Sequence, residues 1–370
     1  MIRTRALALA GALLIAGCSN PADPGGGGDL EIAVDGRLER GAPVRLSAAL
    51  DGAAVVTGVT WSALPAGSVT FEAEGRARLT AAGAVRIIGA VGDAADTLDL
   101  TVSLPPTIAV ERVVSRQRDL WRMALDGGEL ARLTDDPAED RWPSFAAGSL
   151  YFVSYRSPVG VYASPLAGGT AARVTTTGSD FEEAVVSPNG QRLAFTRDAG
   201  GIPKIFVSDR SGANARRLDP ASDEGTVEVA PAWSPDGARI AYVTTASGNA
   251  DIAVIPAAGG TPQRLAVTNR PEVEPAWSPD GARLVFVRAL TTTETRLFVV
   301  DAAGGPDRRL TTAPETASEA LPAFLADGRV VFLRQTASMG MAWVDPARPD
   351  EVVTIPGGVV AESRPVPLGN

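Results

Sequence analysis

Residues 231–242 read Pro231-Ala-Trp233-Ser-Pro-Asp-Gly237-Ala-Arg-Ile-Ala-Tyr242, and residues 275–286 repeat them almost letter for letter as Pro275-Ala-Trp277-Ser-Pro-Asp-Gly281-Ala-Arg-Leu-Val-Phe286. Three weaker copies carry Phe145, Val186 and Phe324 at the position of the tryptophan. This position recurs about every 44 residues, and self-similarity at such a period is typical of repeat architectures. The repeat therefore decides the fold of this part of the chain.

The Ser-Pro-Asp-Gly segment of each good copy predicts a tight turn between two strands. Proline presets φ for the first turn position, aspartate bonds back to nearby backbone, and glycine adopts the left-handed conformation that closes the hairpin. A second hairpin signature occurs six times, as in Leu297-Phe-Val-Val to Gly305, and each copy leads toward a strand such as Arg309-Leu-Thr. Each repeat is thus predicted to hold four strands, which is the content of a propeller blade.

The number of hairpins predicts how the repeats close. Six copies of the second signature stand against five complete copies of the first, so one innermost strand is missing. The C-terminal stretch Glu362-Ser-Arg-Pro365 is similar to the lead-in Glu228-Val-Ala-Pro231, and we expect it to supply that strand to the first blade. Residues 107–370 are therefore predicted to form a closed six-bladed β-propeller in an all-β protein. A linear β-solenoid is the alternative, although its rungs are usually shorter.

The first 28 residues indicate an export signal and a tether. Arg3 and Arg5 precede an apolar run over residues 6–15, which is shorter than the roughly 20 residues of a membrane-spanning helix. Residues 15–18, Ile-Ala-Gly-Cys, resemble a bacterial lipobox, which implies a signal peptide over residues 1–18 and lipidation of Cys18, the single cysteine. An ordinary secretory peptide with a chance cysteine is the alternative. Residues 19–28 are predicted to be a Gly-rich tether.

Residues 29–104 carry short alternating strands between turn residues, which predicts a small β-sandwich of about seven strands. Val59-Thr-Trp-Ser62, followed by Val69-Thr-Phe71, resembles the bacterial immunoglobulin-like domains of surface proteins. The resemblance implies a spacer, with an adhesive module as the alternative, and Trp61 would pack without a disulfide. Pro105-Pro106 marks the boundary to the repeats, because consecutive prolines cannot continue a sheet ladder.

The composition excludes several functions. No histidine occurs among the 370 residues, which excludes Ser-His-Asp and Cys-His catalysis and histidine-ligated metals. Neither Gly-Lys-Ser nor Gly-Lys-Thr occurs, so a P-loop is excluded, and the net charge of −9 disfavours nucleic-acid binding. We therefore predict a protein that is not an enzyme. A carboxylate-dependent glycan-active enzyme on the propeller is the alternative, since two acids across a channel can serve as acid and base.

An acidic residue stands just before each predicted innermost strand. In a closed ring these lead-ins should lie near the mouth of the central channel, where converging carboxylates raise one another's pKa and create a negative potential. We expect them to hold a basic peptide segment or a cation such as Ca²⁺, with no other cofactor and with Asp135 and Asp136 extending the patch. Alternatively, each acid satisfies backbone donors or is solvated. The candidates are Asp140, Glu183 (or Glu182), Glu228, Glu272 (or Glu274), Glu319 and Glu362.

The tryptophans of the repeats are predicted to pack between blades, because they bring a large apolar surface to the junction of two sheets. A ligand cage is the alternative for the same side chains. The residues concerned are Trp121, Trp142, Trp233, Trp277 and Trp343.

The Trp-Ser-Pro-Asp-Gly turn with a downstream Arg-Leu-Thr, as at Trp277 and Arg309, resembles the TolB-like propeller repeats of bacterial envelopes. The resemblance covers residues 107–370 and implies an envelope protein that binds a protein or peptide partner. The lipobox adds attachment to a membrane through Cys18. Ser19 stands where an aspartate typically retains such lipoproteins in the inner membrane, so the outer membrane is favoured, facing the periplasm or the cell surface.

Overall fold

The computed structural model describes residues 29–55, 57–166, 170–266, 268–311, 317–358, 360–361 and 363–368. The chain divides into two compact units between Pro105 and Pro106. The predicted signal peptide (residues 1–18), with Cys18, and the predicted tether (residues 19–28) lie outside the described residues. Within the ranges given above, no helix is both long and apolar enough to cross a membrane.

The first unit is a sandwich of two antiparallel sheets. One sheet has the order β1-β2-β6-β5 with β3 paired to β2, and the other has the order β4-β7-β8. Inward side chains of both sheets share one core, and Trp61 packs against it. Eight strands are present where about seven were expected, and the immunoglobulin-like character remains a prediction. The elements are β1 (Leu30–Gly36), β2 (Pro43–Leu50), β3 (Ala53–Val55), β4 (Thr60–Leu64), β5 (Val69–Phe71), η1 (Ala73–Gly75), β6 (Arg76–Leu79), β7 (Gly83–Val91) and β8 (Ala94–Val102).

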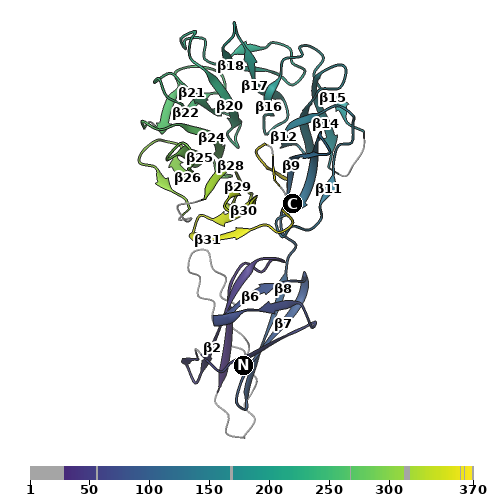
Figure 1. Cartoon of the computed structure of the whole chain (residues 1–370), viewed down its shortest axis with the longest axis vertical. Coiled ribbons are helices and arrows are strands. Elements are labelled where there is room, and N and C mark those ends of the chain that lie inside the picture. The colour runs from purple at the N-terminus through teal and green to yellow at the C-terminus, as the bar shows by residue number, and fades with distance from the viewer. Residues whose placement is uncertain are drawn as a thin grey trace. The chain divides into compact units, whose positions relative to one another are not determined.

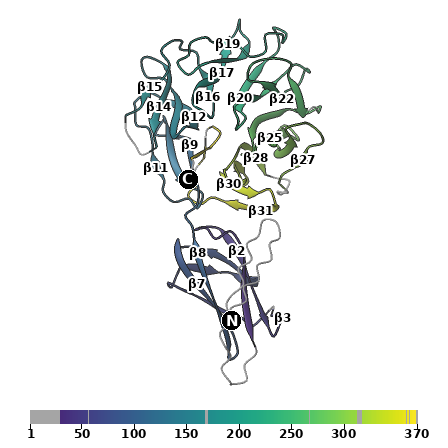
Figure 2. The same cartoon turned by 180° about the vertical axis from the view of Figure 1, so that it is seen from behind.

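The second unit is a propeller of six four-stranded antiparallel sheets, which we number as blades 1–6 (Figures 1 and 2). Blade 1 contains β9 (Thr107–Val114), β10 (Gln117–Ala124), β11 (Ala131–Arg132) and β32 (Val366–Leu368). Blade 2 contains β12 (Asp140–Ala146), β13 (Ser149–Ser154), β14 (Gly160–Pro165) and β15 (Ala172–Arg173). Blade 3 contains β16 (Glu182–Val186), β17 (Arg192–Asp198), β18 (Pro203–Asp209) and β19 (Arg216–Arg217).

The remaining blades follow the same plan, so the predicted six-bladed propeller is confirmed. In Figure 1 the innermost strands β12, β16, β20, β24 and β28 surround the middle of the ring. Blade 4 contains β20 (Glu228–Trp233), β21 (Arg239–Thr244), β22 (Asp251–Pro256) and β23 (Gln263–Ala266). Blade 5 contains β24 (Glu272–Trp277), β25 (Arg283–Ala289), β26 (Thr295–Asp301) and β27 (Arg308–Arg309). Blade 6 contains β28 (Ser318–Phe324), β29 (Val330–Gln335), β30 (Met339–Asp345) and β31 (Arg348–Thr354).

The C-terminal strand closes the ring. β32 pairs with β9 in antiparallel register, with Val366 opposite Ala109 and Leu368 opposite Thr107. The first blade is therefore completed by the end of the chain, as the hairpin count predicted. Figures 1 and 2 both show the C-terminal segment lying beside β9. The pairing leaves no inner sheet edge open at this point, which removes a template for intermolecular pairing.

Apolar side chains bind each blade to the next. Among the described residues, six core clusters lie in the propeller, and each joins two neighbouring blades. Ile108 of blade 1 packs with Val331 and Trp343 of blade 6, so the chain of clusters is itself closed. Because no blade buries its faces alone, the stability of each blade depends on both neighbours.

The Ser-Pro-Asp-Gly turn has the geometry that its residues predict. In blade 4, the Asp236 carboxylate accepts hydrogen bonds from Ser234 Oγ at 2.5 Å and from the Ala238 backbone N–H at 3.0 Å. Gly237 has φ +68°, in the left-handed region that a side chain disfavours. These hydrogen bonds lower the pKa of Asp236, with the serine hydroxyl as the main cause. The turn therefore fixes the register of β20 against β21.

An arginine of one blade stacks on the tryptophan of the next. The Arg239 guanidinium carbon lies 4.6 Å from the ring centroid of Trp277, and Arg192 lies 4.8 Å from that of Trp233. Arg239 Nη2 also donates to the Gly281 carbonyl at 3.2 Å. Trp277 Nε1 donates to the Ala232 carbonyl at 3.0 Å. The tryptophan is thus held from two sides at the junction between blades.

We expect Arg239→Ala to lower the free energy of unfolding of the propeller by about 1–2 kcal/mol, because it removes one cation–π stack and one hydrogen bond. Arg283→Ala is the matched control. Arg283 occupies the corresponding place in blade 5 and is partly buried to a similar degree, but the next blade offers Phe324 and no such stack is recorded in the described part. Urea unfolding followed by tryptophan fluorescence measures both losses. Equal losses for the two variants would contradict the role of the stack.

Candidate functional site

Each innermost strand of blades 2–6 contains a β-bulge at the same place. Two residues are skipped before the regular pairing resumes, and the shift follows Arg141, Glu182, Val229, Val273 and Ala320. A residue with positive φ, between 49° and 58°, occupies each bulge. Bulges redirect side chains and recur beside functional sites. The bulge residues are Trp142, Glu183, Ala230, Glu274 and Leu321.

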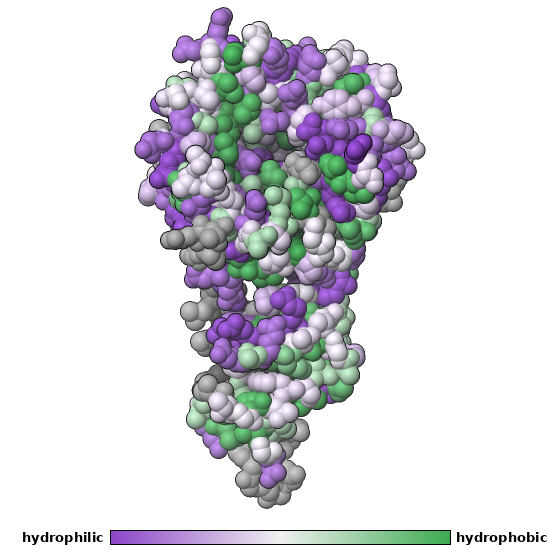
Figure 3. All heavy atoms as spheres, in the orientation of Figure 1, coloured by the Kyte–Doolittle hydropathy of each residue, from purple (hydrophilic) through white to green (hydrophobic). Residues whose placement is uncertain are grey.

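Two bulge residues and Arg364 bring three charged side chains into one cavity. A central channel of about 440 Å³ is lined by all five bulge residues and by Arg364, which precedes Pro365 as Ala230 precedes Pro231. Glu183, Glu274 and Arg364 are its ionisable lining residues and are partly exposed. Trp142 also lines it, while packing against the core between blades 2 and 3. Figure 3 shows hydrophilic and hydrophobic residues interspersed over the propeller in the orientation of Figure 1.

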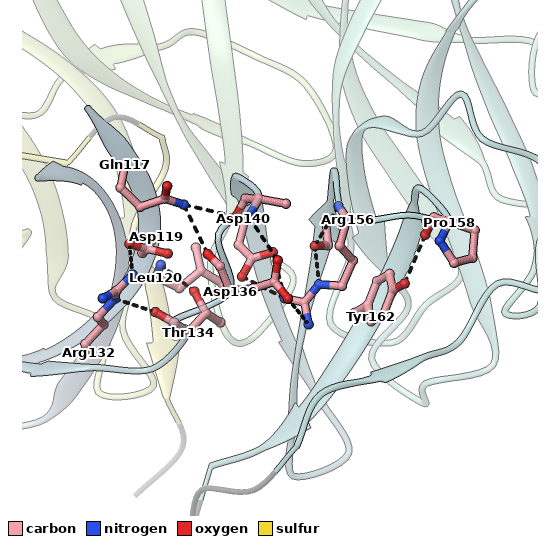
Figure 4. A network of polar contacts seen from close by, with 12 residues as sticks. Gln117, Asp119, Leu120, Arg132, Thr134, Asp136, Asp140, Arg156, Pro158 and Tyr162 are labelled. Carbon is pink, nitrogen blue, oxygen red and sulfur yellow. Dashed lines mark hydrogen bonds and ion pairs between the residues drawn. The ribbon is translucent and has the colours of Figure 1, made fainter. Parts of the chain in front are cut away.

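Four of the predicted site residues are instead fully buried at the starts of the innermost strands. Asp140, Glu272 and Glu319 have no exposed surface, and Glu228 is 1 % exposed. Arg156 Nη2 lies 3.0 Å from both oxygens of the Asp140 carboxylate, and Figure 4 shows this guanidinium directed at Asp140. Arg288 Nε donates to Glu272 at 2.8 Å. Burial raises the pKa of Asp140 and of Glu272, against the effect of their arginine partners.

The other two buried acids satisfy backbone donors of the preceding blade. Glu228 accepts the Ile205 N–H at 3.2 Å, and Glu319 accepts the Leu297 N–H at 3.2 Å. Glu228 also accepts a hydrogen bond from Ser222 and lies 3.9 Å from Nζ of Lys204, the single lysine of the chain. Unpaired buried donors are costly, so these carboxylates hold neighbouring blades together.

The placement of Asp140, Glu228, Glu272 and Glu319 at the channel mouth was therefore wrong. The physical reason is that each carboxylate is buried inside the propeller, where a guanidinium, an ammonium, a hydroxyl or an N–H binds it. A ring of six converging acids is not formed, and the raised pKa values follow from burial instead of mutual repulsion. Of the predicted set, Glu183 does line the channel, as does Glu274, the alternative to Glu272. Glu362 lies outside the described residues.

Carboxylates also bind the bulges themselves. Glu183 Oε2 accepts the Ala230 N–H at 2.7 Å, and Glu274 Oε2 accepts the Leu321 N–H at 2.5 Å. Each of these bonds crosses from one blade to the next. The buried Glu111 of blade 1 accepts the Trp142 N–H at 3.0 Å in the same way. One oxygen of each channel carboxylate is therefore fixed, which orients the side chain.

The channel charges influence one another across the cavity. Burial raises the pKa of Glu274, while Arg364 acts to lower it and Glu183 to raise it. Burial lowers the pKa of Arg364, against the opposite effect of the two carboxylates. Between Arg364 and either carboxylate no ion pair is present in the described part of the chain. Within that same part, no group of three or more acidic or cysteine side chains is placed to hold a metal ion, and Ca²⁺ binding stays a prediction.

A pattern in the sequence could have identified the channel-lining residues that were not predicted. In the repeat, the residue directly before the proline differs from blade to blade, although its neighbours recur. In blades 2, 4, 5 and 6 this variable position is the bulge, and it includes Trp142, which was assigned to the core. The missed Arg364 precedes a proline in the same way in blade 1. Alternation along a regular strand would place Glu272 and Glu274 on one face, so periodicity alone could not separate them. The residues before proline are Trp142, Ala230, Glu274, Leu321 and Arg364.

Fold and channel together define a six-bladed β-propeller with a charged central cavity. Residues 214–354 match the family described as the TolB beta propeller domain. Over 53 residues the chain is 45% identical to the Tol-Pal system protein TolB of Nitrosomonas europaea, a stretch that covers 14% of this chain and 12% of that protein. The propeller is therefore TolB-like.

Two solved structures share this fold. TolB from Acinetobacter baumannii superposes with a TM-score of 0.58 at 19% identity, covering 78% of this chain and 80% of that chain. A structure assigned to TolB from Agrobacterium tumefaciens gives a TM-score of 0.53 at 18% identity, covering 68% of this chain and 88% of that chain. At these identities the likeness shows the fold alone.

We expect Arg156→Met to lower the free energy of unfolding by about 3–5 kcal/mol at neutral pH, because it leaves the Asp140 carboxylate buried without its counterion. Burial already raises the folded-state pKa of Asp140, and losing Arg156 raises it further. The deficit should be largest above the folded-state pKa of Asp140 in the variant and shrink as pH falls toward the lower folded-state pKa of the wild type, since the protonated acid needs no cation.

Urea unfolding of wild type and variant at pH 7.5 and pH 5 measures this change. Arg348→Met is the control, because it breaks a largely solvent-exposed pair with Glu351 at 3.7 Å and should cost at most about 1 kcal/mol. A deficit for Arg156→Met that is small, or that does not change with pH, would contradict the assignment.

Proposed function

We propose that this protein is a cell-envelope lipoprotein, anchored through Cys18, whose propeller binds a protein or peptide partner at its central channel. The TolB-like propeller supports an envelope role, because a relative with this propeller is a Tol-Pal system protein. The lipobox-like residues 15–18 support the anchor and favour the outer membrane. The partner carries a basic segment, since the channel holds two carboxylates against one guanidinium.

The observation that carries this proposal is the contrast between the two sets of acids. One set is buried and bound by groups inside the propeller, namely Asp140, Glu228, Glu272 and Glu319. The other set, Glu183 and Glu274, keeps exposed surface in an open cavity. A cavity of about 440 Å³ with few, oriented polar groups in an apolar wall has the character of a binding site. Binding through this channel requires neither a histidine nor a metal ion.

A pull-down from envelope extract tests the proposal with the double variant Glu183→Gln and Glu274→Gln. Glutamine keeps an oxygen that can accept the bulge N–H, so the blades should stay in place while the negative charge is lost. We expect at least a tenfold loss of the retained partner, with the unfolding temperature changed by only a few degrees. The matched control is Glu182→Gln, which removes an exposed acid next to Glu183 that does not line the channel.

Retention unchanged by the double variant would contradict binding at the channel. Release of sugars from a panel of envelope glycans by the wild-type chain would contradict a function in binding alone and would favour the carboxylate-dependent enzyme. Acylation is tested separately: Cys18→Ala should move the protein from the membrane fraction to the soluble fraction. A variant that stays in the membrane fraction would contradict the anchor.

A further inference from the structure

The positive and negative side chains of the channel are separated from one another. The lining residues follow the order of the blades, so Arg364 of blade 1 lies three blades away from Ala230 of blade 4. Glu183 of blade 3 and Glu274 of blade 5 lie on either side of Ala230. The positive group and the negative pair therefore lie on opposite sides of the ring. Glu183 and Arg364 influence the pKa of Glu274, and both carboxylates influence that of Arg364, but no ion pair closes the gap within the described residues. Opposite charges held apart across a cavity leave room for a ligand that carries both signs.

Arg364 is set to receive an anion. Its Nε is shielded from solvent and has no hydrogen-bond partner among the described residues. A buried guanidinium nitrogen without a partner is unfavourable, and the planar fork of this partly exposed side chain matches a carboxylate with two parallel hydrogen bonds. Neither channel carboxylate meets this need, because each points one oxygen at the bulge N–H of the following blade.

Glu183 and Glu274 are set to receive a cation between them. Oε2 of Glu183 accepts hydrogen bonds from the Ala230 N–H at 2.7 Å and from the Thr196 hydroxyl at 2.9 Å. Oε2 of Glu274 accepts a hydrogen bond from the Leu321 N–H. No bond to Oε1 of either residue is recorded in the described part. The methyl group of Ala230 is the small side chain that separates these two carboxylates around the ring. An ammonium group is compact enough to occupy that interval.

Apart from Ser144 and Ser363, the rest of the lining is apolar. Trp142 and Leu321 occupy the bulges of blades 2 and 6, on either side of Arg364. Prolines, valines, alanines and further aromatic side chains complete the apolar wall. A ligand that fits this cavity therefore has an ammonium at one end, a carboxylate at the other and an apolar frame between them.

We propose that the channel binds a small zwitterionic solute, namely a short apolar peptide with free amino and carboxyl ends, whose ammonium lies between Glu183 and Glu274 and whose carboxylate binds Arg364. The volume of the channel, about 440 Å³, lies near the lower end of the usual range for small-molecule sites, about 300–1,000 Å³. This inference goes beyond the proposed partner binding, because it needs no second protein.

Isothermal titration of the full chain, purified in detergent, with leucyl-alanine tests the proposal. The matched ligands are N-acetyl-leucyl-alanine, which lacks the ammonium, and leucyl-alanine amide, which lacks the carboxylate. We expect binding of the free dipeptide with a rise in unfolding temperature. Each blocked form should bind at least about tenfold more weakly, since it loses a hydrogen bond to a charged group of the channel.

Variants identify the channel as the place of binding. Glu274→Gln and Arg364→Gln should each weaken the free dipeptide by at least about tenfold, and Arg364→Lys should weaken it less because the charge is kept. Glu182→Gln should leave the affinity unchanged, since Glu182 does not line the channel. Thermal unfolding of each variant shows whether the propeller is intact, and the blocked peptides test the wild-type chain without any substitution.

Four results would overturn the proposal. Equal binding of the amide would show a site that recognises only a cation, and equal binding of the acetylated form would show one that recognises only an anion. An affinity unaffected by Glu274→Gln and Arg364→Gln would place the peptide elsewhere. Heat and unfolding temperature that do not change at millimolar dipeptide would show that no such site exists. The pull-down of a protein partner is independent of all four results.

Discussion

Three residues at the end of the chain hold the propeller together. Val366–Leu368 form hydrogen bonds to β9 and so complete blade 1 with a strand from the opposite end of the fold. Without this pairing, β9 would present an open inner edge, and the cluster that joins blades 6 and 1 would lose its support. The channel exists only because the ring is closed, since its lining comes from all six blades. Closure is thus the constraint on which both stability and the candidate site depend.

The bulge is the second constraint, because it gives two acids of one strand different surroundings, one buried and one in the channel. In blade 5, Glu272 and Glu274 are two residues apart, yet one is buried beside Arg288 and the other faces the channel. The register shift between Val273 and Ala276 turns the chain at Glu274, which adopts φ +58°. A non-glycine residue in this conformation carries a backbone cost of about 1–2 kcal/mol. Five such residues occur at equivalent positions of five blades, so the bulge is a regular feature of the repeat.

Hydrogen bonds between blades explain how this strain is tolerated. Glu111, Glu183 and Glu274 each bind the N–H of a bulge residue in the following blade. Alternate bulges are therefore held by a carboxylate, and two of these three carboxylates also face the cavity. The same side chains that orient the ring supply its negative charge. Coupling of this kind means that the geometry of the channel and the packing of the blades cannot change independently.

By itself the sequence determined the repeat, the four strands of each blade and the closure by the C-terminus. These features follow from local rules: the Ser-Pro-Asp-Gly turn fixes a hairpin, and a count of hairpins fixes which strand is missing. It also supplied Glu183, but it placed Asp140, Glu228, Glu272 and Glu319 at the channel. Only the tertiary structure decided which acids face water, because burial depends on the neighbouring blade. A register shift of one residue cannot be seen in the periodicity of the sequence, and it places the bulge residues in the channel in place of the acids at the start of each strand.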